Sequence, residues 1–334
     1  MKQFIPEKIY YEPGIKEYPL GRQLIRKYHG IPTEPIANHN NIETMRTQPN
    51  SNFPKMKRCL IIGTRKTHKY VPNEKSSDFL VPYTSSGCTA MCMYCYLVCN
   101  YNKCAYLRLF VNREDMLERL IKKAGSFPDE KIFEIGSNSD LVLENTITEN
   151  LTWTISQFCE QPKGKLTFPT KFAMVDPLLN LNHKGRIIAR VSLNPDYIIR
   201  QTEFGTSSLT ERIGAINKLC EAGYPVGILV APVIFLDGWQ SLYTDLIETM
   251  VSQLSPKARG SVFFEVIFMT YSYIHDKINT DAFPNAIQVF DKDLMTGRGR
   301  GKYWYKPAIR SEGEQFFRDL FQRWFPHNEL LYIV

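Results

Sequence analysis

Residues 79–96 read FLVPYTSSGCTAMCMYCY, a short apolar stretch followed by a loop with three cysteines. Cys88, Cys92 and Cys95 have the spacing C-x3-C-x2-C. Gly87 permits the turn that starts the loop, because glycine adopts backbone conformations that other residues avoid. Three thiolates this close in sequence can converge on one centre. The stretch therefore predicts a β-strand that leads into a metal or cluster site.

The ligand chemistry leaves three alternatives for this loop. Soft thiolates select iron–sulfur clusters, zinc or copper(I). A saturated iron–sulfur cluster takes four cysteines, so three cysteines leave one iron open, as a catalytic centre requires. Structural zinc, with Cys99 or Cys104 as the fourth ligand, is the second alternative. The third is a chance grouping of core cysteines.

The composition is that of a globular protein. The chain has 334 residues, of which 43% are hydrophobic and 13% aromatic, which excludes a disordered, collagen-like or low-complexity protein. No apolar run is long enough to span a bilayer, and the N-terminus lacks the apolar region of a signal peptide. We therefore expect a cytoplasmic protein without membrane contact, in which clustered cysteines bind metal before they form disulfides. The net charge of +7 permits a polyanionic partner without requiring one.

Short apolar strands alternate with amphipathic helices through the middle of the chain. We expect strands at 79–83, 132–135, 165–168, 187–193, 226–231 and 262–268. We expect helices at 112–124, after the capping box Ser208–Glu211, and at 239–254. Repeated strand–helix units predict a parallel sheet with right-handed crossovers, and apolar runs such as GILVAPV fit strands buried on both faces. A partial (β/α) barrel and a doubly wound sheet both fit this pattern.

The alternation divides the chain into three parts. Residues 1–76 form an N-terminal extension packed on the barrel, with one strand at 59–63 and the basic stretch TRKTHKY after it. Residues 77–270 form the β/α array. Residues 271–334 form a C-terminal extension with a segment rich in glycine and arginine.

The cysteine spacing, at the end of the first strand of a β/α array, resembles that of the radical S-adenosylmethionine enzymes. In that family three cysteines bind a [4Fe-4S] cluster, and S-adenosylmethionine takes the open iron. An electron from the cluster then cleaves S-adenosylmethionine and yields a 5′-deoxyadenosyl radical. The resemblance implies a partial (β/α)6 barrel with its site at the carboxyl ends of the strands, where barrel enzymes keep their chemistry.

Further segments resemble one family within this group, the spore photoproduct lyases. They are FIPEKIYYEPGIKEYPLG, GTRKTHKY, GCTAMCMYCYL, YLRLFVN, TKF, SLN, FGTSS, LVAP and GRGKYWY, in this order from residue 4 to residue 305. This resemblance implies repair of the ultraviolet lesion 5-thyminyl-5,6-dihydrothymine in double-stranded DNA, with return of two thymines. It also implies an unidentified electron donor, a location in the spore core and a monomeric enzyme.

The resemblance assigns roles to residues of this chain. Cys88, Cys92 and Cys95 match the cluster ligands. The cofactor contacts are matched by Tyr94, Ser139, Lys171, Ser192 and Ala231. Each of these has a structural alternative, such as the cap of a turn or a helix for the serine in NSD, a solvated lysine or barrel filler.

Hydrogen transfer is where this chain departs from the familiar form of the family. Tyr96 matches a tyrosine assigned to hydrogen transfer beside the lesion, and exclusion of water is its alternative role. Ser137 stands where the familiar form has the cysteine that donates hydrogen to the thymine radical, and a serine O–H bond is far stronger than a thiol S–H bond. Cys99 and Cys104 are extra thiols, and small buried residues without a chemical role are the alternative for both. The simplest scheme is a relay from one of them through Tyr96 and Tyr94 to deoxyadenosine.

A basic, aromatic segment near the C-terminus is the candidate DNA contact. Residues 294–310 contain five cations and no acidic residue, and their glycines suit a tight hairpin. Cations bind phosphates, and aromatic side chains wedge or stack on bases. An ordinary basic loop is the alternative. The predicted substrate and DNA contacts are Ser137, Arg298, Arg300, Lys302, Tyr303 and Tyr305, and a second basic patch of Arg65, Lys66 and Lys69 is expected to be a solvated face.

Two other functions stay open at this point. Because Ser137 replaces the usual donor, a radical S-adenosylmethionine enzyme with an altered substrate is one alternative. A zinc-stabilised nucleic-acid binding protein without catalysis is the other.

Overall fold

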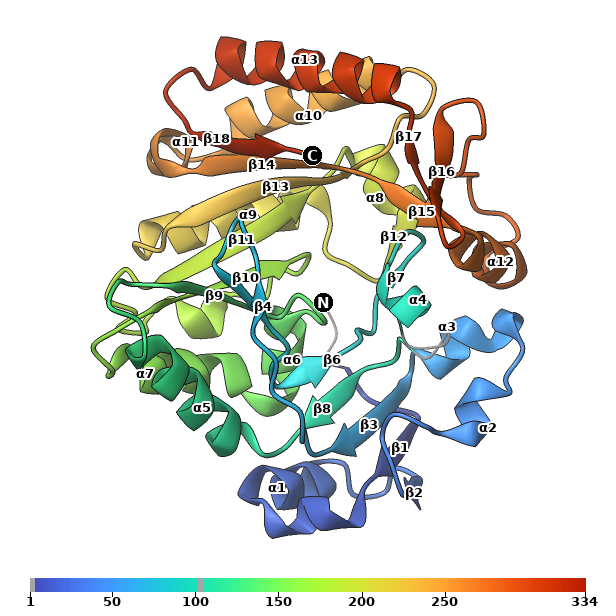
Figure 1. Cartoon of the computed structure of the whole chain (residues 1–334), viewed down its shortest axis with the longest axis vertical. Coiled ribbons are helices and arrows are strands. Elements are labelled where there is room, and N and C mark those ends of the chain that lie inside the picture. The colour runs from blue at the N-terminus through green and yellow to red at the C-terminus, as the bar shows by residue number, and fades with distance from the viewer. Residues whose placement is uncertain (1–3, 101–104) are drawn as a thin grey trace.

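The computed structural model describes residues 4–100 and 105–334, and a curled eight-stranded sheet is its main element (Figure 1). The sheet order is β18-β14-β13-β11-β10-β9-β5-β4. Six of these strands lie parallel and in chain order: β5 (Phe79–Val81), β9 (Ile132–Ile135), β10 (Lys165–Thr170), β11 (Ile187–Leu193), β13 (Val226–Val233) and β14 (Phe263–Phe268). They are the six strands expected from the sequence. The predicted partial (β/α)6 barrel is therefore confirmed.

Helices cover the outer face of this sheet (Figure 1). They are α5 (Arg113–Gly125), α6 (Leu141–Thr148), α7 (Asn150–Cys159), α8 (Asp196–Thr202), α9 (Leu209–Glu221), α10 (Trp239–Gln253), α11 (Pro256–Ser261) and α13 (Pro307–Trp324). The predicted capping box starts α9, since the Ser208 hydroxyl accepts from Glu211 N and the Glu211 carboxylate accepts from Ser208 N at 2.8 Å. Gly223 follows this helix with a φ of +84°.

A second sheet packs beside the barrel, with the order β2-β1-β3-β8-β6. Its strands are β1 (Lys8–Tyr11), β2 (Thr33–Pro35), β3 (Cys59–Gly63), β6 (Ser85–Ser86) and β8 (Arg108–Phe110), of which only β6 is antiparallel to its neighbour. The short helices beside it are η1 (Pro13–Glu17), α1 (Pro19–Lys27), α2 (Glu43–Arg46), η2 (Asn50–Asn52) and α3 (Phe53–Met56).

Strand pairing crosses both of the expected domain boundaries. β6 and β8 lie beyond residue 76 yet complete the N-terminal sheet, and β8 was not expected from the sequence. The barrel sheet in turn includes β4 (Val71–Pro72), antiparallel to β5, and β18 (Leu330–Ile333), parallel to β14. The division into 1–76, 77–270 and 271–334 stays a prediction.

The expected hairpin is present at the carboxyl end of the barrel. β16 (Met295–Gly299) and β17 (Lys302–Tyr305) pair antiparallel, and β15 (Thr270–Ser272) joins them directly after β14. The turn residues Arg300 and Gly301 have φ values of 52° and 68°, as a type I′ turn requires. α12 (Tyr273–Ala282) lies beside this small sheet (Figure 1).

The remaining elements are short. They are β7 (Met91–Cys92), α4 (Leu97–Asn100), η3 (Asp176–Leu178) and β12 (Glu203–Phe204). No helix within the described residues has the length and apolarity that a bilayer crossing needs.

Candidate active site

The cysteine loop is held at both ends by backbone contacts. At its start, Gly87 has a φ of +72°, and a Cβ atom there would lie 2.0 Å from the carbonyl oxygen of Tyr106. Gly87 N also donates to Asn138 O at 2.7 Å. Further along, β7 pairs antiparallel with β12, so that Cys92 lies opposite Glu203. Gly87 is therefore required at the start of the loop, because it adopts a positive φ and because it has no Cβ atom to clash with Tyr106.

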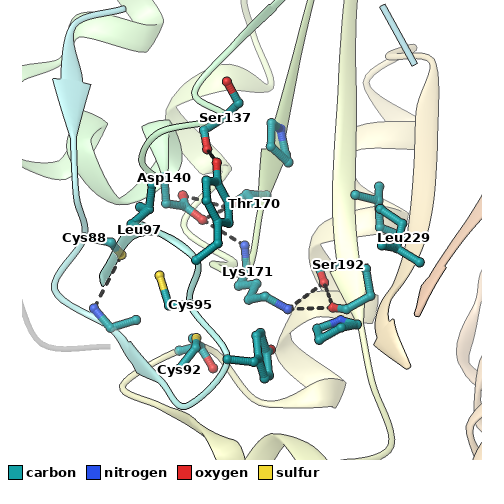
Figure 2. Close-up of a pocket in the computed structure, with 18 of the residues that line it drawn as sticks. Cys88, Cys92, Cys95, Leu97, Ser137, Asp140, Thr170, Lys171, Ser192 and Leu229 are labelled. Atoms are coloured by element: carbon teal, nitrogen blue, oxygen red, sulfur yellow. Dashed lines mark hydrogen bonds between the residues drawn. The ribbon is translucent and has the colours of Figure 1, made fainter. Parts of the chain in front are cut away.

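One cavity of about 330 Å³ opens above this loop, at the carboxyl ends of the barrel strands (Figure 2). We call it the cysteine cavity. The residues expected for the cluster, the cofactor and the lesion that line it are Cys88, Cys92, Tyr94, Cys95, Tyr96, Ser137, Ser139, Lys171, Ser192 and Ala231. Cys99 lies in α4, but its side chain, like the whole of Cys104, lies outside the described residues. The fold thus brings together residues that span more than a third of the chain.

The three thiols suit a cluster. All three are free of disulfides. Burial raises the pKa of the Cys88 thiol to about 12, and burial raises the pKa of the Cys92 thiol as well. Buried thiols become ligands when a metal centre replaces their protons. Within the described residues no group of three His, Cys, Asp or Glu side chains is placed to hold a single metal ion. In a cluster, by contrast, the thiolates bind different irons.

Lys57 is a buried cation beside this loop, and the sequence did not single it out. Its ammonium donates to the carbonyl oxygens of Cys88 at 2.9 Å and Ala105 at 2.8 Å. Its exposed fraction is 3%, and it forms no ion pair with a carboxylate of the described residues. A buried charge is costly unless it is paired. An anionic thiolate cluster bound next to Cys88 would supply the missing negative charge, so the three thiols and their surroundings fit a [4Fe-4S] cluster.

Lys171 reaches across the cavity floor from the end of β10. Its ammonium donates to Ser192 Oγ at 2.8 Å, to Ala231 O at 2.8 Å and to Glu203 Oε1 at 2.9 Å. Figure 2 shows the lysine side chain extended toward Ser192, with the cysteines on its other side. Lys171 is therefore not a solvated surface lysine.

Glu203 is the centre of a buried ion network that sequence reasoning missed. Besides Lys171, the carboxylate binds Arg212 Nη2 at 2.6 Å and accepts from Asn194 Nδ2 at 3.1 Å. Tyr94 donates its hydroxyl to the same carboxylate. Burial alone raises the pKa of Glu203, but Arg212 and Lys171 outweigh it and hold this pKa well below its usual range. Of this network, Lys171 lines the cavity, so its ammonium is the cation that an anionic group of a ligand would meet there.

Asp140 and Ser139 connect the next strand end to the cavity. Asp140, rather than Ser139, caps α6, since its carboxylate accepts from Val142 N at 3.1 Å and Leu143 N at 3.2 Å. The Ser139 hydroxyl instead accepts from Ser85 Oγ at 2.7 Å and lines the cavity. The helix-cap alternative for Ser139 is therefore wrong.

Tyr96 and Ser137 meet at the rim of the cavity. The Tyr96 hydroxyl donates to the backbone carbonyl oxygen of Ser137. Tyr96 is 49% exposed, so it is not a buried aromatic that merely excludes water from the loop. Both residues line the cavity, Tyr96 from the cysteine loop and Ser137 from the segment after β9.

Of the predicted DNA contacts on the hairpin, some lie at the surface and others are buried. Arg298, Arg300 and Lys302 are exposed, and the Arg298 guanidinium lies 4.7 Å from the ring of Trp304. Tyr303 is half-buried against Phe290.

Tyr305, which was expected to contact DNA, lies in the core. It is 1% exposed, and its hydroxyl accepts from Phe235 N at 3.1 Å. Successive residues of a strand point to opposite faces, and Tyr305 takes the face turned to the core. The prediction that it contacts DNA is wrong.

Known proteins match this chain over nearly its whole length. The family model described as spore photoproduct lyase matches residues 4–334. Spore photoproduct lyase of Bacillus subtilis (strain 168) is 33% identical over 342 aligned residues, which cover 99% of each chain. The enzyme of Geobacillus sp. (strain Y412MC61) is 31% identical over 100% of each chain.

Solved structures give the same result. A spore photoproduct lyase complexed with dinucleoside spore photoproduct has a TM-score of 0.92 at 29% identity, with 100% of both chains covered. A mutant with bound AdoMet and dinucleoside spore photoproduct has the same score, identity and coverage. A match of this extent in sequence and in structure shows that the chain belongs to the spore photoproduct lyase family.

Proposed function

We propose that this protein is a radical S-adenosylmethionine lyase that returns 5-thyminyl-5,6-dihydrothymine in DNA to two thymines. The observation that carries the proposal is the cysteine cavity, in which a C-x3-C-x2-C loop faces Lys171 and Ser192. Relatives with the same fold bind dinucleoside spore photoproduct and AdoMet. A double-stranded DNA partner, an unidentified electron donor, a monomeric state and a location in the spore core belong to the same proposal.

Each part of the cavity has its own task. Cys88, Cys92 and Cys95 hold a [4Fe-4S] cluster, which together with S-adenosylmethionine supplies radical chemistry when both are bound. Lys171 and Ser192 present an ammonium and a hydroxyl to the anionic group of the cofactor. The other proposed cofactor contacts are Tyr94, Ser139 and Ala231. Because Glu203 binds both Lys171 and the Tyr94 hydroxyl, it fixes the two groups relative to each other.

Hydrogen return needs a donor other than Ser137. Abstraction of the hydrogen at C6 of the lesion is followed by cleavage of the linking C–C bond, which leaves a thymine radical. We assign the donor role to a thiol, Cys99 or Cys104, or to the Tyr96 phenol. The donor gives one hydrogen atom to the thymine radical, and Tyr96 and Tyr94 return one hydrogen atom from 5′-deoxyadenosine to the donor. One hydrogen atom leaves the lesion and one is returned to it, so the reaction consumes no net S-adenosylmethionine.

The proposed DNA contacts lie on the hairpin and at the cavity rim. Arg298, Arg300 and Lys302 contact backbone phosphates, with Tyr303 beside them and Ser137 next to the lesion. A damaged step costs less to unstack than an intact one, so extrusion of the lesion into the cavity is feasible.

The decisive experiment is anaerobic reconstitution followed by assay on the dinucleoside lesion. We expect a brown iron–sulfur species, cleavage of S-adenosylmethionine and release of thymidylyl thymidine, measured by chromatography. A cyclobutane thymine dimer, which lacks the methylene link, is the matched control and stays unchanged. Stoichiometric zinc without iron would favour the nucleic-acid binding protein, and cofactor cleavage without repair would favour an altered substrate.

A further inference from the structure

A second cavity, of about 470 Å³, lies in the N-terminal sheet and shares no lining residue with the cysteine cavity. We call it the N-terminal cavity. Its lining residues come after β1, β2 and β3, from the end of β8 and from the segment around β6, and they include Glu12, Asn38, His39, Arg65, Lys66 and Lys69. It therefore lies at the carboxyl ends of the four parallel strands. Its volume is in the range of small-ligand sites.

The topology makes this end of the sheet a natural ligand site. The parallel strands have the order β2-β1-β3-β8, so the chain leaves β1 toward one edge and later returns to add β3 and β8 on the other side. The strand order reverses between β1 and β3. In open parallel sheets, ligands bind outside the carboxyl ends of the strands at this reversal. Glu12, directly after β1, and Thr64, directly after β3, meet at this point.

Glu12 is already fully occupied by the protein. Its Oε1 accepts from His39 N at 3.0 Å and lies 2.8 Å from His39 Nδ1, and its Oε2 accepts from Thr64 N at 3.0 Å. The carboxylate thus ties the loops after β1, β2 and β3 together. It lines the cavity and forms no ion pair with the cations that line it among the described residues.

Three cations line the cavity. Arg65 is oriented by Tyr83 O, to which Nε donates at 2.7 Å, and its guanidinium lies 4.1 Å from the Phe110 ring. Lys66 and Lys69 are exposed, and neither forms an ion pair or hydrogen bond with any described residue. Against the single carboxylate of Glu12, these cations give the cavity a positive surplus. Amide groups of Asn38 and Asn40 add neutral hydrogen-bonding capacity.

We propose that the N-terminal cavity binds a phosphate group. A phosphate offers several charged acceptor oxygens to an oriented guanidinium and two mobile ammonium groups. The phosphate has two possible sources, a free nucleotide or the backbone of the DNA substrate. Ser86 lines this cavity and Cys88 lines the other, so the Cα atoms of the two walls are at most about 7 Å apart at this point. The site is nevertheless separate from the proposed lyase chemistry, and its test needs no catalytic activity.

The test is a double variant, Lys66→Gln and Lys69→Gln, measured by calorimetry with inorganic pyrophosphate and with 2′-deoxyadenosine 5′-monophosphate. We expect about a tenfold loss of pyrophosphate affinity, because two charge-assisted hydrogen bonds can no longer form. The matched control is Lys55→Gln with Lys122→Gln, two exposed lysines outside the cavity that lose the same charge. Unchanged thermal unfolding of both variants shows that the fold is intact.

A duplex oligonucleotide without a lesion distinguishes the sources. If the cavity takes a DNA phosphate, the salt dependence of duplex binding becomes weaker in the Lys66 and Lys69 variant and not in the control. If the source is a free nucleotide, the variant loses affinity for 2′-deoxyadenosine 5′-monophosphate while duplex binding matches the control. Equal affinity of variant and control for all three probes overturns the proposal.

Discussion

The Lys171 ammonium lies 2.9 Å from Glu203 Oε1, so the cation at the cavity floor is held by a buried acid of β12. Glu203 pairs in the backbone with Cys92, which places this ion pair directly behind the cysteine loop. Arg212 binds the other oxygen of the carboxylate and is fully buried. The Glu203 side chain thus connects the cysteine loop, the end of β10 and helix α9.

Replacement of Glu203 by Gln is expected to lower the free energy of unfolding by about 3 kcal/mol, because two buried cations, Lys171 and Arg212, lose their common anion. Urea unfolding of the metal-free protein measures this change. The control is Asp176→Asn, which breaks the exposed ion pair with Lys218 and is expected to cost less than about 1 kcal/mol. Equal effects of the two substitutions would mean that Glu203 does not compensate the buried cations.

Cys88→Ala, Cys92→Ala and Cys95→Ala are each expected to abolish cluster assembly, because each removes one of the three proposed ligands. Iron content after anaerobic reconstitution measures the result. Cys220→Ala, in the buried face of α9, is the control and retains its iron. Cys99→Ala and Cys104→Ala are also expected to retain iron, and loss of iron in either one would indicate four protein ligands and no open position.

Gly87→Ala is expected to disrupt the cysteine loop. The new methyl group would lie 2.0 Å from a backbone carbonyl oxygen, and the positive φ is unfavourable for alanine. Gly185→Ala is the matched control, since Gly185 also has a positive φ, +69°, but has no atom within 4 Å of the added Cβ. We expect loss of iron only in the Gly87 variant, and a drop of roughly 1 kcal/mol in stability for the control. Normal iron content in Gly87→Ala would contradict the close approach of the two backbones.

Hydrogen return is tested by Tyr96→Phe, Cys99→Ala and Cys104→Ala. Removal of the true donor or relay group is expected to leave S-adenosylmethionine cleavage intact, while repair fails or trapped adducts accumulate. Chromatography of both products from one reaction separates the two effects. Wild-type repair rate and fidelity in all three variants would reject the relay. Ser137→Cys is the complementary variant, since it supplies a thiol at the cavity rim and is expected to support repair when it is combined with Cys99→Ala or Cys104→Ala.

The hairpin is tested by salt dependence. Neutralisation of Arg298 and Arg300 by Gln is expected to reduce the slope of log affinity for duplex DNA against log salt by about 0.9 for each phosphate that the protein no longer neutralises. Fluorescence anisotropy over a salt series measures the slope, and the variant Lys55→Gln with Lys122→Gln is the control for net charge. An unchanged slope would place the DNA on another face.

Much of the barrel was predictable because its signals are local. Each buried parallel strand is a short apolar run, and each helix carries its own apolar spacing and caps, as Ser208 and Glu211 show. The strand β8 was missed, because its three residues are too few to show a period. The cysteine spacing predicted the cluster loop for the same reason, since all three thiols lie within one turn-rich segment.

The β/α order, the cysteine loop and the basic hairpin could be predicted without a structure, because each is encoded in neighbouring residues. Folding was needed to place Glu203 between Lys171 and Arg212, to bury Lys57 beside the loop and to turn Tyr305 into the core. It also assembled the N-terminal cavity from loops that follow separate strands. These features depend on contacts between residues far apart in the chain. A local sequence pattern does not show which distant side chain will neutralise a charge or cover a ring. The burial of a side chain and its ion-pair partner are fixed only when the strands take their order in the sheets.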